Sequence, residues 1–85
     1  MNVRVRINFY NDAGDEGVLR SQMAFPQIPA VGEKVQVRKG GNFYEVISVL
    51  YGLTTGQANI DLGEHNLSAA TVRGLVAGGW RKSAK

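Results

Sequence analysis

Val3-Arg4-Val5-Arg6-Ile7-Asn8-Phe9-Tyr10 is the stretch that decides the fold, because its side chains alternate strictly between apolar and polar. Successive side chains of a β-strand point to opposite faces of the sheet, so this period of two predicts a strand with one buried face. The expected buried residues are Val3, Val5, Ile7 and Phe9. The polar side chains between them then face solvent, and a mostly-β domain is expected.

Four more strands and one helix are expected downstream. The strands cover residues 18–25, 34–38, 43–51 and 57–62, and glycines bound them. Residues 43–51 carry apolar side chains on both faces, which predicts a central strand covered from both sides. The helix covers residues 67–77, with Asn66 or Ser68 as its N-cap and Gly78-Gly79 as its stop signal.

Five short strands separated by turns favour a meander that curls on itself. We therefore expect a five-stranded antiparallel barrel, or a strongly curved sheet, with a short C-terminal helix that plugs one open end. In this interpretation residues 1–80 form a single domain, and residues 81–85 form a basic disordered tail.

Residues 25–49 resemble a known group of small proteins. The pattern is Phe25-Pro26-x-Ile28-Pro29-x-Val31-Gly32-Glu33-x-Val35, followed by Gly41-x-x-Tyr44-x-Val46-x-x-Val49. It is similar to that of the SH3-like β-barrel proteins found in phages, plasmids and other mobile elements. The resemblance implies an SH3-like fold and an origin in a mobile element. Many such proteins have no assigned activity, so it implies a fold more than a function.

The chain has 85 residues and no cysteine, which limits the means of stabilising its core. A domain of this size buries only about 60% of the surface that its unfolded chain exposes. Disulfides and thiolate metal sites are excluded, so oligomerisation is the stabilising device to expect. We expect a two-fold homodimer. Its candidate contact residues are Tyr51, Leu53, Val76 and Trp80.

Targeting and membrane segments are not expected. The alternating start of the chain lacks the continuous apolar stretch of about 7–15 residues that marks a signal peptide. No run approaches the roughly 18 apolar residues of a transmembrane helix. The absence of cysteine fits a reducing compartment. These features predict a cytoplasmic protein with no membrane partner.

The net charge of +3 is concentrated near the end of the chain, at Arg81, Lys82 and Lys85. The other residues include seven basic and seven acidic side chains. A basic excess on the fold itself is typical of nucleic-acid-binding domains. The distribution of charge along the chain therefore does not favour that function.

Cations nevertheless occupy the outward positions of the first three expected strands. If these strands are neighbours, the cations share one face with a tyrosine that can stack on a base. The candidate nucleic-acid-binding residues are Arg4, Arg6, Tyr10, Arg20, Lys34 and Arg38. The same charges also suit an ordinary solvated face that resists aggregation. The acidic loop of Asp12, Asp15 and Glu16 would oppose nucleic acid, so both interpretations stay open.

Catalytic and metal chemistry find little support in the sequence. His65, the only histidine, lies in Asp61-x-x-Glu64-His65, the densest cluster of potential ligands. A metal site needs convergent ligands that further hydrogen-bond partners orient, and the sequence supplies no such partners. No serine has the glycine pattern of a nucleophile elbow. We expect no enzyme, no catalytic residue, no metal and no cofactor.

The leading functional expectation is a non-enzymatic interaction module that binds a protein partner or itself. Two alternatives stay open. One is a nucleic-acid-binding barrel that uses the basic face, and the more remote one is a small metal-dependent enzyme centred on His65.

Overall fold

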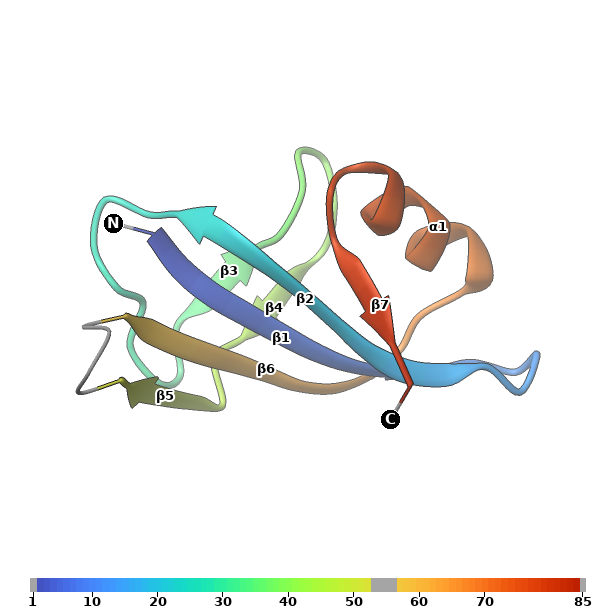
Figure 1. Cartoon of the computed structure of the whole chain (residues 1–85), viewed down its shortest axis with the longest axis horizontal. Coiled ribbons are helices and arrows are strands. Elements are labelled where there is room, and N and C mark those ends of the chain that lie inside the picture. The colour runs from blue at the N-terminus through green and yellow to red at the C-terminus, as the bar shows by residue number, and fades with distance from the viewer. Residues whose placement is uncertain (1, 53–56, 85) are drawn as a thin grey trace.

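The structure is a computed structural model that describes residues 2–52 and 57–84. Its elements are β1 (Asn2–Tyr10), β2 (Glu16–Ala24), β3 (Lys34–Gln36), β4 (Phe43–Glu45), β5 (Ser48–Tyr51), β6 (Ala58–Asn66), α1 (Ala69–Ala77) and β7 (Arg81–Ser83). Five strands form one sheet in the order β5-β6-β1-β2-β7, and β3 and β4 form a separate sheet (Figure 1). The prediction of a mostly-β domain with a short C-terminal helix is confirmed.

β1 is the middle strand of the larger sheet, and its predicted alternation is confirmed. Its fully buried side chains, with 0–1% of their surface exposed, are Val3, Val5, Ile7 and Phe9. Arg4 and Arg6 are exposed on the other face. β2 pairs with β1 in antiparallel fashion along its whole length, as the expected hairpin requires.

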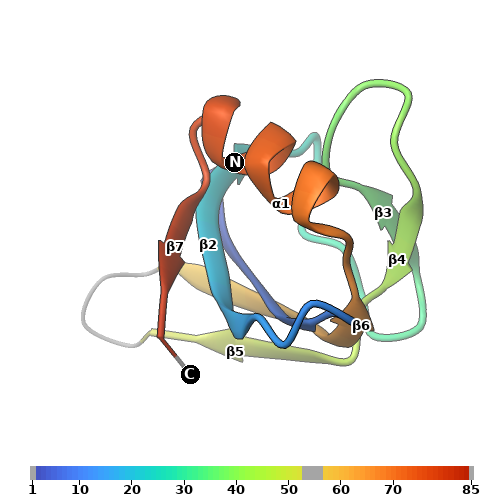
Figure 2. The ribbon, with the colours of Figure 1, turned by 90° about the vertical axis from the view of Figure 1, so that its right-hand side faces the viewer.

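The second edge of β1 is occupied by β6, which runs parallel to it with Ile60 opposite Val5. The predicted antiparallel arrangement is therefore wrong, and the sheet is mixed. After β2 the chain forms β3 and β4 and returns as β5. It then reverses into β6, which lies between β5 and β1. β5 and β7 remain as the two ends of the sheet, so it does not close into a barrel (Figure 2).

A bulge makes β6 longer than the expected residues 57–62. Where β1 advances by two residues, β6 advances by three, from Asp61 to Glu64. Gly63 has a φ of +79° at this point, a conformation that side chains with a Cβ adopt only with strain. The strand then continues to Asn66, so Gly63 marks a bulge and not the end of the strand.

Residues 43–51 form two strands where one long central strand was predicted. β4 belongs to the smaller sheet and β5 to the larger one. The chain changes sheet at Val46 and Ile47, whose N–H groups each donate over 2.8 Å to the carbonyls of Glu33 and Asp61 respectively. The change of sheet also explains the apolar residues on both faces, because Val46 is fully buried whereas Ile47 is 53% exposed.

A second layer, made of β3, β4 and α1, covers the apolar face of the larger sheet (Figures 1 and 2). Side chains from the sheet and from this layer form one hydrophobic cluster. The second layer contributes residues that include Val35, Tyr44, Val46, Val72, Leu75 and Trp80. Because the core lies on one side only, the opposite face of the sheet is open to solvent.

The helix begins after Ser68, whose hydroxyl oxygen accepts a hydrogen bond from the N–H of Thr71 at 3.2 Å. This contact identifies Ser68, one of the two predicted candidates, as the N-cap. The helix ends at Gly78, whose N–H donates to the carbonyls of Gly74 and Leu75. Among the described residues, no helix is long and apolar enough to cross a bilayer.

The expected disordered tail, residues 81–85, is partly ordered. Arg81–Ser83 form β7, which pairs with β2 so that Arg81 lies opposite Arg20. The expectation is wrong for these three residues, because the free edge of β2 supplies partners for their backbone groups. Lys85 lies outside the described residues.

The bulge generates a prediction for stability. A residue other than glycine in the left-handed region costs about 1–2 kcal/mol. At Gly63 an added Cβ would also lie 3.1 Å from the side chain of Ile47. We expect Gly63→Ala to lower the free energy of unfolding by more than Gly14→Ala, which has a φ of +85° but meets no atom within 4 Å. Urea unfolding measures both, and equal losses would contradict the packing role of Gly63.

Candidate functional site

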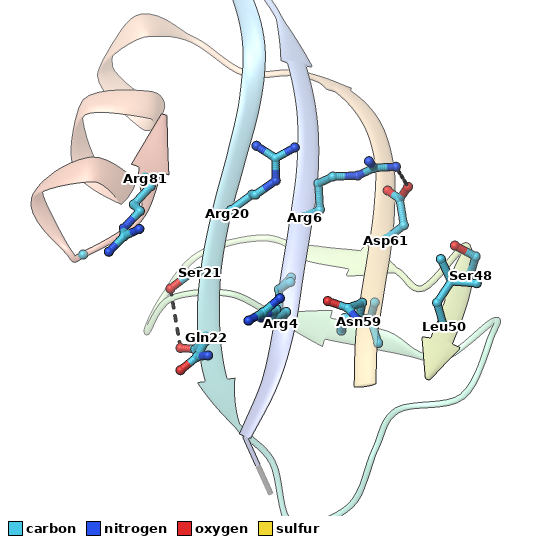
Figure 3. A pocket seen from close by; sticks show the side chains of 13 residues that line it. Arg4, Arg6, Arg20, Ser21, Gln22, Ser48, Leu50, Asn59, Asp61 and Arg81 are labelled. Carbon is cyan, nitrogen blue, oxygen red and sulfur yellow. Dashed lines mark hydrogen bonds and ion pairs between the residues drawn. The ribbon is translucent and has the colours of Figure 1, made fainter. Parts of the chain in front are cut away.

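The register of the larger sheet sorts its outer side chains into rows across the strands. Neighbouring strands lie about 4.7–4.9 Å apart, so the side chains of opposed residues form a row across the sheet. The first row, from β5 to β7, contains Ser48, Asp61, Arg6, Arg20 and Arg81. The second row contains Leu50, Asn59, Arg4 and Gln22. Figure 3 shows both rows together on the outer face.

The two rows line a hollow with a volume of about 820 Å³. Its charged side chains are Arg4, Arg6, Arg20, Arg81 and Asp61. The four arginines are all exposed to solvent. Four cations and one anion give the hollow a net charge of +3, which equals the formal net charge of the whole chain. The hollow is thus a positively charged region of the fold.

Three arginines of the first row stand in direct register. Arg20 lies opposite Arg6 on one side and opposite Arg81 on the other. Like charges at opposed positions of a sheet repel each other and destabilise the pairing. Asp61 forms an ion pair with Arg6 at one end of this series. Within residues 2–52 and 57–84, no carboxylate pairs with Arg20 or Arg81.

Asp61 is fixed by the backbone as well as by its ion pair. One carboxylate oxygen accepts a hydrogen bond from the N–H of Gly63 at 2.8 Å, which closes the bulge. Its carbonyl accepts from the N–H of Ile47 at 2.8 Å. The position of this carboxylate is therefore set by the structure of β6, and it neutralises only one of the four arginines.

β7 brings the last arginine into the first row, and two contacts hold the strand in place. The guanidinium of Arg20 donates to the hydroxyl of Ser83 at 2.9 Å. On the core side, the ammonium of Lys82 lies 5.7 Å from the centre of the Phe9 ring, within the range of a cation–π interaction. These contacts connect β7 to both β1 and β2, and so they position Arg81.

The residues proposed from the sequence are only partly brought together. Arg4, Arg6 and Arg20 share the outer face of the sheet, as expected, and they line the hollow. Tyr10 is on the same face but at the far end of β1, opposite Glu16 and outside the hollow.

Lys34 and Arg38 do not share the basic face. Lys34 belongs to β3, which is not a neighbour of β1 or β2. The side chain of Arg38 lies beside Gly41 and Gly74, where α1 packs. The condition under which all the cations would share one face is therefore not met, because β3 leaves the larger sheet and covers its apolar side.

Several residues of the hollow were not identified as site residues from the sequence. They are Gln22, Asn59, Asp61 and Arg81. The alternation of residues 57–62 indicates that Asn59 and Asp61 face outward. No local signal shows that this strand lies beside β1. Arg81 was predicted to lie in a disordered basic tail, because β7 is a strand only through its pairing with β2.

The cluster around His65 does not converge. His65 lies opposite Phe9 on the core side of the sheet, and its ring contacts that of Tyr44 with centroids 4.8 Å apart. Its Nε2 is 2.6 Å from the carbonyl oxygen of Leu62. Asp61 faces the opposite side. In the described part of the chain, no three histidine, aspartate or glutamate side chains gather as a metal site would require.

The four residues proposed for self-association do not form one patch. Trp80 is only 6% exposed and belongs to the core. Val76 is on α1 and Tyr51 is on β5, and the two views place these elements far apart (Figures 1 and 2). Leu53 lies outside the described residues. Tyr51, at 68% exposure, remains available for contact with a partner.

No protein-family model, curated protein or solved structure matches this chain. The resemblance to SH3-like proteins of mobile elements therefore stays a prediction. The chemistry of the residues that line the hollow is the remaining indication of function.

The close approach of β7 generates a prediction. A Cβ at Gly17 would lie 2.5 Å from the carbonyl oxygen of Ser83 and 3.1 Å from the ring of Phe9. We expect Gly17→Ala to displace β7, and with it Arg81. Hydrogen exchange would then show faster exchange in β7 with little change in β6. Gly78→Ala, whose Cβ meets only ordinary contacts at 3.5 Å, is the control. Unchanged protection of β7 in Gly17→Ala would contradict this interpretation.

Proposed function

We propose that the protein is a non-enzymatic nucleic-acid-binding module that holds phosphate groups on its first row. The observation that carries this proposal is the direct register of Arg6, Arg20 and Arg81, in a row whose carboxylate, Asp61, pairs with Arg6. Guanidinium groups bind phosphate oxygens through paired hydrogen bonds. A bound phosphate also relieves the repulsion between neighbouring arginines, so the ligand stabilises an arrangement that is unfavourable without it.

The distribution of acidic residues supports a ligand at this end of the sheet. The turn that contains Asp12 and Asp15 follows Tyr10, at the opposite end of β1 from Arg4. Glu16 pairs with Tyr10 at that same end. The sequence suggested that this acidic loop would repel nucleic acid. In the fold the loop lies away from Arg4, so a phosphate chain in the hollow does not pass over it.

The proposal predicts a salt-dependent affinity for nucleic acid that depends on the first row. We expect a fluorescein-labelled single-stranded oligonucleotide to bind at low salt, as measured by fluorescence anisotropy. Removal of one phosphate contact by Arg20→Gln or Arg81→Gln should weaken binding and flatten the slope of log affinity against log salt by about 0.7. Arg73→Gln, an exposed arginine on α1, is the matched control and should change neither quantity.

Absence of binding at low salt would end this proposal. Equal losses from Arg73→Gln and Arg20→Gln would show that the attraction is a property of net charge and not of the first row.

We also propose that the protein self-associates through the open edge of β5. The observation that favours it is the character of this strand, which ends the sheet, carries no charge and exposes Leu50 and Tyr51 by 66% and 68%. The N–H of Gly52 donates to the Gln57 carbonyl at 2.9 Å. By the alternation of an antiparallel ladder, the backbone groups of Val49 and Tyr51 then point toward the open edge, where another β5 can pair.

Light scattering tests this second proposal. We expect a mass near twice 9.2 kDa, and a shift to the single-chain mass in Tyr51→Lys, because a charge on an edge strand opposes pairing. Phe43→Lys, which alters a 61% exposed aromatic on β4, should leave the dimer intact. A single-chain mass for the unmodified protein at every concentration would refute edge pairing.

A further inference from the structure

We infer that the second row reads the base edges of a single-stranded nucleic acid whose phosphates lie on the first row. This inference rests on the proposed function, and it adds the type of strand and the residues that contact bases. The two rows line the same hollow, so one ligand can contact both.

The second row has the mixed hydrogen-bonding character that bases require. Phosphate oxygens only accept hydrogen bonds, so the donors of arginine side chains are sufficient to bind them. Base edges present donors and acceptors together, and a carboxamide offers one oxygen and one NH₂ group to match them. Asn59 and Gln22 lie opposite Arg4 on its two sides. A base that enters this row therefore meets two carboxamides and a guanidinium on three adjacent strands.

The carboxamides are available for a ligand. Among the residues drawn in Figure 3, the marked interactions join Arg6 to Asp61 and Ser21 to the backbone carbonyl of Gln22. The side-chain amides of Gln22 and Asn59 thus make no hydrogen bond with their neighbours in the hollow. Gln22 is exposed and Asn59 is half-buried, so a ligand can reach both.

The second row also supplies side chains on which the flat rings of bases can pack. Leu50 stands next to Asn59 at the end of the row and is 66% exposed. An exposed apolar side chain beside the carboxamide of Asn59 allows a ring to pack on Leu50 while its edge forms hydrogen bonds with Asn59. The guanidinium plane of Arg4 can stack on a base in the way that arginines do in single-strand recognition.

The spacing of the rows suits a nucleotide whose phosphate lies on the first row and whose base lies on the second. Residues two apart on a strand are separated by about 6.4–6.8 Å, so the two rows run side by side at that distance. A nucleotide carries its phosphate and its base on opposite sides of one sugar. A strand laid along the hollow can therefore place phosphates on Arg20 and Arg81 and point its bases at the second row.

The geometry favours a single strand over a duplex. In a duplex the base edges lie at the bottom of grooves, and the major groove admits a helix or a two-stranded ribbon. Here Asn59 and Gln22 belong to β6 and β2, on the face of a sheet, and both line the hollow. They reach base edges only when the bases are unpaired and turned toward the sheet.

Three probes of equal length test the inference by fluorescence anisotropy: a mixed-sequence single strand, the same backbone without bases, and the duplex. We expect the single strand to bind at least about tenfold more tightly than the abasic strand, the equivalent of one good base contact. Gln22→Met combined with Asn59→Leu should lower this ratio, although Leu50 and Arg4 still pack on the bases, and should leave the affinity for the abasic strand unchanged. Arg81→Gln should weaken the binding of the mixed-sequence strand and of the abasic strand equally, and so preserve the ratio of their affinities.

Gln27→Met is the matched control, because Gln27 is an exposed carboxamide outside the hollow. Thermal melts of all variants verify folding, and Gln22→Met alone replaces the double variant if the latter does not fold. Equal affinity for the strands with and without bases, or tighter binding of the duplex, would overturn base reading while leaving phosphate binding intact. Failure of all three probes to bind at low salt would overturn the proposed function as well.

Discussion

The burial of one face of β1 is the constraint on which the rest of the structure depends. Its four apolar side chains leave water only if another layer covers them, and β3, β4 and α1 form that layer. Because the side chains of a strand alternate, the same burial turns Arg4 and Arg6 to the open face. β2 and β6 repeat this separation in register with β1, so the apolar core and the charged hollow arise from a single pattern.

The open face has an electrostatic arrangement that stability alone does not favour. Arg20 stands between Arg6 and Arg81, although opposed like charges weaken strand pairing. The ion pair between Asp61 and Arg6 is partly exposed, and pairs of this kind contribute only about 0–1 kcal/mol. Binding of an anion supplies a physical reason for the arrangement, because it converts repulsion between the arginines into shared attraction for a ligand.

The sequence predicts the local features of this protein and fails at the non-local ones. The alternation of β1, its hairpin with β2 and the Ser68 cap depend on neighbouring residues, and all three were predicted. The parallel pairing of β6 with β1 joins residues far apart in the chain, and no local pattern encodes it. The same limit applies to the site. Arg4, Arg6 and Arg20 were predicted from two adjacent strands, whereas Arg81 joins them only through β7.

Amide chemical-shift mapping by NMR during titration with a single-stranded oligonucleotide tests the central claim most directly, because it locates the ligand on the fold without altering a residue. The account predicts shifts in the strands that carry the two rows, strongest around Arg4, Arg20 and Arg81, with the amides of α1 and β3 nearly unchanged. Shifts centred on α1 or on β3 and β4, or no shifts at low salt, would contradict it.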